Sequence, residues 1–78
     1  MRKPLSLAAK QIVIALYRLN GRRVTKKELW LTDEKLPALT TVEKYLPMLA
    51  KDHWISMDEG LFWVSVLQMD AIRKEFEE

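Results

Sequence analysis

The first third of the chain carries an apolar stripe with the spacing of one helix face. Its members recur at steps of three and four residues: Ala8, Ile12, Leu16 and Leu19. This period predicts an amphipathic helix from about Leu5 to Leu19, with the stripe turned toward a core. Asn20 and Gly21 follow, and both tolerate the left-handed backbone that ends many helices.

Two further apolar side chains of this helix, Leu7 and Ile14, fall on roughly the opposite face, seven residues apart. One interpretation is a second apolar seam that contacts a partner or a second copy of the chain. The other is that they are two separate surface side chains, which need no explanation.

A second helix is predicted after a short extended segment at 22–24. Thr25 and Glu28 have the spacing of a capping box, in which the Thr hydroxyl and the Glu carboxylate each accept a bond from the other residue's backbone N–H. The helix that follows carries Leu29 and Trp30 and should end near Thr32.

A third helix is predicted in the middle of the chain, where Thr40 and Glu43 repeat the capping-box spacing. We therefore expect it to begin at Thr41 and to end near Asp52. Three apolar residues should face the core, with Tyr45 beside them: Val42, Leu46 and Leu49. Pro47 removes a helical hydrogen bond, which predicts that the helix is kinked, or divided near Leu46.

The last part of the chain predicts a corner, a hairpin and a final helix. His53 occupies the corner, and residues 54–57 and 61–66 are aromatic and β-branched, as strands prefer. The loop 58–60 is short and contains a glycine, which suits a tight hairpin. An i, i+3, i+7 stripe then predicts a C-terminal helix over about 67–78: Met69, Ile72 and Phe76.

The composition limits the domain organisation and the compartment. A chain of 78 residues holds one small domain, here 1–78, with a core over about 5–66. There is no cysteine, which suits a reducing compartment, and we expect a cytoplasmic protein. The longest apolar run, 12–17, is too short to cross a membrane, and Lys10 and Arg18 interrupt any signal-peptide pattern.

Charge is distributed very unevenly along the chain. Residues 1–27 contain eight basic residues and no acidic one, whereas residues 28–78 contain five basic and eleven acidic residues. This polarity favours an electrostatic partner at one end of the molecule, although a bipolar solvated surface would show it too.

Catalytic and metal-site patterns are lacking. The chain has one histidine, no cysteine and no glycine-rich phosphate loop. Metal binding by His53 with Asp52 and Asp58 has no support from ligand spacing. Asp58 and Glu59 could be posed as a catalytic pair, but a solvated hairpin tip suits turn formation and solubility better than acid–base catalysis. We expect no enzyme activity, no cofactor and no metal.

The three tryptophans could stack on nucleic-acid bases, but aromatic residues at such positions more often fill a small core. We expect Trp30 in the core, together with one of Trp54 and Trp63. Neighbours on a strand point to opposite faces, so Phe62 and Trp63 should not be buried on the same side.

The predicted order is helix, short strand, helix, helix, hairpin and helix. Its most specific stretches are Thr25-Lys26-Lys27-Glu28-Leu29 and Thr41-Val42-x-Lys44-Tyr45-Leu46-x-x-Leu49, continued by Ile55. In these residues the chain resembles the winged helix-turn-helix proteins, in particular the small MarR/ArsR-like DNA-binding domains. The resemblance implies a mostly helical α+β fold, with a three-helix core, a two- to three-stranded β-wing and a C-terminal helix.

The resemblance also implies a dimeric transcriptional regulator that binds duplex DNA. The second helix would meet the DNA backbone, and the helix over 41–52 would enter a groove. The implied DNA-binding residues are Arg22, Arg23, Lys26, Lys27, Thr41, Lys44 and Lys51. Arg2 and Lys3 would add phosphate contacts.

His53 departs from that family, which commonly has glycine at this corner. Other features favour a protein-interaction module, such as an inhibitor or adaptor, on the same scaffold: the wing tip is acidic, and Leu7 and Ile14 offer an extra apolar patch. The outward face of the third helix lacks the Arg, Asn and Gln side chains that read bases best. Candidate contacts with a partner or second copy are Leu7, Ile14, Met48, Met69, Ile72 and Phe76.

Overall fold

A computed structural model describes residues 5–76 as a small, mostly helical α+β domain with one antiparallel sheet. The elements in chain order are α1 (Leu7–Arg18), α2 (Lys26–Leu31), α3 (Leu39–Lys51), β1 (Ser56–Asp58), β2 (Leu61–Trp63) and α4 (Val66–Phe76). Across this described part of the chain, every helix is too short or too polar to cross a lipid bilayer.

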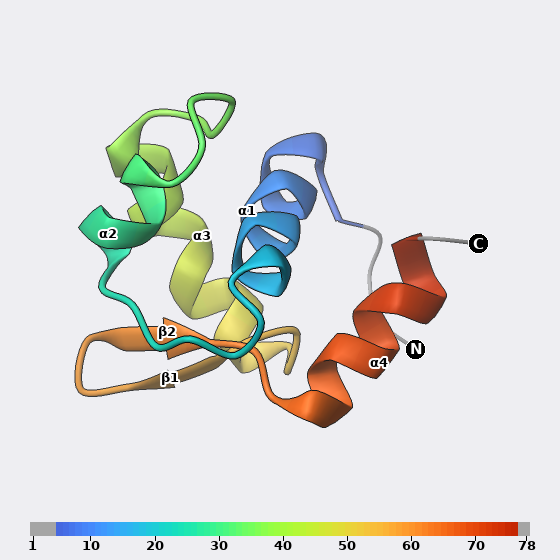
Figure 1. Ribbon diagram of the computed structural model, residues 1–78. Coiled ribbons are helices and arrows are strands. Elements are labelled where there is room, and N and C mark those ends of the chain that lie inside the picture. The colour runs from blue at the N-terminus through green and yellow to red at the C-terminus, as the bar shows by residue number, and fades with distance from the viewer. Residues whose placement is uncertain (1–4, 77–78) are drawn as a thin grey trace.

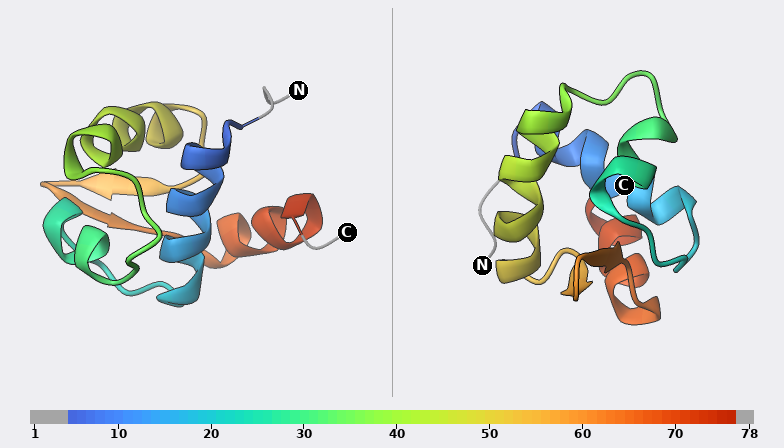
Figure 2. Two further views of the ribbon diagram at one scale, coloured as in Figure 1. Left: turned by 90° about the horizontal axis from the view of Figure 1, so that it is seen from above. Right: turned by 90° about the vertical axis from the view of Figure 1, so that its left-hand side faces the viewer.

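Helix α1 stands in the middle of the molecule, with α2 and α3 on one side and α4 on the other (Figure 1). The hairpin of β1 and β2 lies below α2 and α3. Figure 2 shows from above that the hairpin extends between these two helices. Helix α1 contacts both α3 and α4, so it joins the two halves of the fold.

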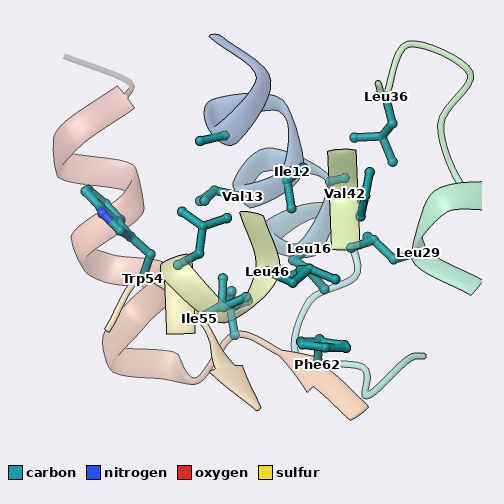
Figure 3. Packing of buried hydrophobic residues seen from close by; sticks show 14 of the residues in the cluster. Ile12, Val13, Leu16, Leu29, Leu36, Val42, Leu46, Trp54, Ile55 and Phe62 are labelled. Atoms are coloured by element: carbon teal, nitrogen blue, oxygen red, sulfur yellow. The ribbon is translucent and has the colours of Figure 1, made fainter. Parts of the chain in front are cut away.

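The core lies where α1, α2, α3 and the sheet meet, and all of its side chains are apolar (Figure 3). Helix α1 contributes Ile12 and Leu16, α3 contributes Leu46, and the sheet contributes Phe62. No polar or charged side chain is buried within residues 5–76. Any chemistry of the described residues is therefore carried by the surface.

Helix α1 begins two residues later than predicted, because Ser6 caps it. The Ser6 hydroxyl accepts a hydrogen bond from the backbone N–H of Ala9 at 3.2 Å. Ala9 is buried and Ala8 is only half-buried, so the buried stripe is turned slightly from the predicted one.

Helix α2 begins with the predicted capping box. The Thr25 hydroxyl accepts from the Glu28 N–H at 3.2 Å, and the Glu28 carboxylate accepts from the Thr25 N–H at 2.9 Å. The Thr25 N–H and the Thr25 hydroxyl, both beside the Glu28 carboxylate, lower the pKa of Glu28, and the positive charge of Arg22 lowers it further. The helix ends at Leu31 with Thr32 as its C-cap, as predicted.

Helix α3 begins earlier than predicted, and the division near Leu46, one of the two predicted effects of Pro47, is absent. Its first residue is Leu39 and its N-cap is Ala38, with no side-chain cap, so Thr40 and Thr41 lie within the first turn. The Ala38 carbonyl instead accepts from the backbone of Thr41. The helix runs through Pro47 without division.

The corner after α3 is a tight turn centred on His53, whose φ is 64°. The N–H of His53 donates to the Ala50 carbonyl at 3.1 Å, and the N–H of Trp54 donates to the Leu49 carbonyl at 3.0 Å. These two bonds form a Schellman motif, which usually has glycine at the left-handed position. The turn directs Trp54 into the core, where it is buried.

Strand β1 pairs with β2 in the register Ser56 to Trp63, Met57 to Phe62 and Asp58 to Leu61. Glu59 and Gly60 form the turn, and both have positive φ, as a two-residue hairpin requires. Val24 adds an isolated bridge, since its backbone exchanges two hydrogen bonds with Phe62. Both strands are shorter than predicted.

The residues predicted as the end of the second strand instead begin α4. Ser65 and Gln68 form a second capping box: the Gln68 N–H donates to the Ser65 hydroxyl at 3.2 Å, and the Ser65 N–H donates to the Gln68 side-chain oxygen at 2.8 Å. The same oxygen accepts from the Ser56 hydroxyl at 2.9 Å, and the Gln68 amide donates to the His53 carbonyl. Gln68 therefore ties α4 to β1 and to the corner after α3.

The tryptophans divide between core and surface. Trp54 is buried and stacks on Phe76 of α4, with ring centroids 5.5 Å apart. Trp30 packs against the core while half-buried, and its indole N–H donates to the Pro37 carbonyl at 3.0 Å. Trp63 is half-buried and Phe62 is buried, in agreement with the predicted alternation.

Candidate nucleic-acid interface

One side of α3 is an exposed surface, which we call the α3 face. Its residues follow the helical spacing i, i+4, i+7, i+8 and i+11: Thr40, Lys44, Pro47, Met48 and Lys51. All five are exposed, whereas Thr41, predicted to point outward, is half-buried. Because α3 begins at Leu39, Thr40 is part of the helix and lies one turn before Lys44 on the exposed side.

The α3 face carries two lysines one above the other along the helix, with apolar side chains between them. Lys44 and Lys51 are seven residues apart, or about 10 Å along the axis. Met48, with 54% of its surface exposed, stands one turn from Lys44, and Pro47 stands one turn from Lys51. Neither lysine forms an ion pair with another described residue.

Four cations gather between the end of α1 and the first turn of α2, and we call them the basic segment: Arg22, Arg23, Lys26 and Lys27. All four side chains are exposed. The Lys26 ammonium forms an ion pair with the Glu43 carboxylate of α3. This contact joins the basic segment to the flank of α3, beside the α3 face.

Arg23 is placed by an aromatic ring. Its guanidinium lies over the Trp63 ring, 4.3 Å from the ring centroid, in cation–π geometry. Trp63 is on the sheet face opposite to the buried Phe62. The arginine is thus held against the outer face of β2.

Some cations of the basic N-terminal third make contacts away from α3. Lys10 lies 6.0 Å from the Phe76 ring centroid, beside α4. Arg18 makes a 3.9 Å ion pair with Asp33, after α2. Arg2 and Lys3 lie outside the described residues. The basic N-terminal third is therefore only partly gathered beside α3.

An open groove of about 470 Å³ separates the second half of α3 from the hairpin. Pro47 and Lys51 line it on the helix side, and Ser56 and Met57 line it on the strand side. Met57 is half exposed, so the groove continues the apolar part of the α3 face toward β1.

The hairpin tip is acidic, as the sequence indicated. Asp58 and Glu59 are exposed, and Glu59 sits in the turn with φ of 50°. Anionic side chains at this tip would repel a phosphate backbone that came close to them. The exposed cations on α3 and in the basic segment would instead attract phosphate.

The predicted partner contacts divide between surface and core. Leu7 and Met48 are exposed, at 73% and 54%. Ile72 is buried at 2%, so its contact is with this chain's own core and not with another molecule. Met69 and Phe76 also pack against that core. The amphipathic stripe of α4 is used to cover α1.

Ile14 is likewise drawn into an intramolecular contact. It lines a crevice of about 190 Å³ between α1 and α4, together with Tyr17, Ile72 and Phe76. The seam that Leu7 and Ile14 were expected to form is therefore partly occupied by α4. Exposed apolar side chains that the sequence reasoning missed are Leu31, Met57, Val66 and Leu67.

Within residues 5–76, no group of three or more His, Asp and Glu side chains is arranged to hold a metal ion. Comparison of the chain with protein-family models, with curated proteins and with solved structures gives no match. Function therefore has to be inferred from the chemistry of the surface itself.

Proposed function

We propose that this chain is a winged-helix protein that binds duplex DNA through the α3 face and the basic segment, as a small transcriptional regulator does. Supporting the winged-helix assignment, the order α1, Val24 bridge, α2, α3 and hairpin is the order that this architecture has. Val24 pairs with β2, so β2 is the middle of the three extended segments.

The observation that carries the proposal is the ion pair between Lys26 and Glu43. It joins the start of α2 to α3, so Lys27 and Lys44 lie on two elements that are in contact. DNA binding depends chiefly on several cations that reach successive phosphates together.

The proposed site favours phosphate contacts over detailed base reading. Lysine is a flexible point charge, and it approaches phosphates or guanine edges without the rigid fork of arginine. Lys44 and Lys51 have this character, and α3 contains no Arg, Asn or Gln. We therefore expect a modest ratio between specific and non-specific affinity.

The test is the affinity for a duplex of mixed sequence at several salt concentrations. The paired variant Lys27→Ala with Lys44→Ala should lower the magnitude of the log affinity–log salt slope by about two, one for each lost phosphate contact. The matched control is Lys35→Ala with Lys74→Ala, which changes the net charge equally outside the proposed surface. Equal slopes for the two double variants, or no duplex binding at low salt, would contradict the proposal.

The alternative is a non-enzymatic protein-interaction module. It is favoured by the acidic hairpin tip and by the exposure of Leu31, Val66 and Leu67, at 69%, 77% and 83%. A second copy of this chain is one such partner. Light scattering of the wild type and of Leu67→Asp tests that partner: a dimer formed through this apolar surface would lose mass in the variant, and an unchanged mass would remove Leu67 as a dimer contact.

A further inference from the structure

The apolar centre of the α3 face has no role in phosphate binding. Met48 and Pro47 are exposed between Lys44 and Lys51, and both are turned away from the core. Covering this exposed apolar area with an apolar group of a ligand removes it from water, which favours binding. Because the pair lies between two cations, a matching ligand carries negative charges on both sides of an apolar group.

Duplex DNA has such a surface in its major groove. The C5-methyl group of thymine is the apolar feature at the base edges there, and it lies between two phosphate backbones. A helix fits into that groove, and the two lysines would reach outward toward phosphates while the side chains between them face the bases. The adaptable thioether chain of methionine suits contact with a small methyl group.

We propose that Met48 and Pro47 read pyrimidine C5-methyl groups, so that the protein prefers duplex sites rich in thymine at the positions below α3. This inference rests on the proposed DNA-binding function. Lys44 and Lys51 then supply affinity that is insensitive to sequence, and the apolar pair supplies the discrimination. Met57, across the groove from Pro47, extends the same apolar surface.

The experiment compares two random-sequence duplex pools that differ only in thymine or uracil, so that the methyl group is the single chemical change. The thymine pool should bind more tightly, by about threefold to fourfold for each methyl group that becomes buried. A third pool with 5-methylcytosine in place of cytosine returns a C5-methyl group to the uracil DNA. It should recover part of the lost affinity.

Two exposed-residue variants separate the roles. Met48→Gln should reduce the preference for thymine while leaving the salt slope unchanged. Lys44→Gln should reduce the salt slope while leaving the preference unchanged. Leu67→Gln, at an apolar position on α4 that is even more exposed than Met48, is the control and should change neither.

Equal affinity for the thymine and uracil pools would overturn this inference and leave the DNA-binding function intact. A preference for thymine that is undiminished in Met48→Gln would also overturn it, because Met48 would then carry no part of the reading. If neither pool binds at low salt, both this inference and the proposed function fail, and a protein partner remains for the α3 face.

Discussion

The Lys26 ammonium of α2 contacts the Glu43 carboxylate of α3, and this ion pair joins the two elements of the proposed DNA interface. It also neutralises one cation of the basic segment at the edge of the α3 face. The same contact that positions the surface therefore limits its positive charge.

Replacing Glu43 with Gln should raise duplex affinity, because Lys26 becomes available to a phosphate. We expect the salt slope to steepen by about one. Both side chains are partly exposed, so the free energy of unfolding should change by no more than about 1 kcal/mol. Binding isotherms at three salt concentrations check this. Glu34→Gln, an exposed acid after α2, is the control, and an equal gain from it would show a general charge effect.

The capping box of α2 makes stability depend on pH at one identified residue. The pKa of Glu28 is lower in the folded chain than in the unfolded chain, so its ionised form stabilises the fold. This stabilisation is complete above the ordinary glutamate pKa of about 4.3, and it is lost as the pH falls through the lowered value.

Glu28→Gln keeps the shape of the side chain and removes its titration. Urea denaturation should find wild type more stable than this variant near neutral pH, with the difference shrinking below about pH 4. A difference that stays constant with pH would show that the carboxylate charge is not involved.

Gln68 should be more important for stability than its partly exposed position suggests. It caps α4 and also bonds to Ser56 and to the His53 carbonyl. Gln68→Ala should lower the free energy of unfolding by about 1–2 kcal/mol, and Ser56→Ala, which removes one of these bonds, by about 0.5–1 kcal/mol. Chemical denaturation of both variants measures this order, and a Gln68→Ala variant as stable as wild type would contradict the role.

The hairpin turn should accept a stabilising substitution. Glu59 has a φ of 50°, which asparagine adopts more readily than glutamate. Glu59→Asn should therefore raise the free energy of unfolding by roughly 0.5 kcal/mol. Glu59→Gln removes the same charge without the backbone preference, and a thermal melt should show no comparable gain for it.

The capping-box spacing correctly predicted the start of α2, but it did not locate the starts of α3 and α4. Thr25 and Glu28 form contacts within four residues, so the spacing alone located α2. At α3 the chain entered the helix at Leu39, before the threonines that were expected to cap it. The Ser65–Gln68 box was present in the sequence too, but the aromatic and β-branched run before it favoured a strand.

The sequence indicated which residues belong to the candidate site, but not which of them contact one another. Spacing placed Lys44 and Lys51 on one face of α3, and the structure agrees. The contacts of Lys26 with Glu43 and of Arg23 with Trp63 join residues far apart in the chain, which periodicity cannot reveal.

The sequence also could not show whether the apolar stripe of the C-terminal helix contacts a partner or this chain itself. An apolar stripe shows which face of a helix is buried, but not whether the covering surface belongs to the same chain. Ile72 and Phe76 cover α1 and Trp54 of this molecule. The stripe that looked available for a partner is thus used within the fold.

DNA binding by this chain is best tested by titrating the isotopically labelled protein with a duplex and following the backbone amide chemical shifts. Binding through the α3 face and the basic segment predicts salt-sensitive shifts at residues 22–27 and along the exposed side of α3, at Lys44, Met48 and Lys51. Shifts confined to Leu31, Val66 and Leu67, or no shifts at low salt, would contradict it.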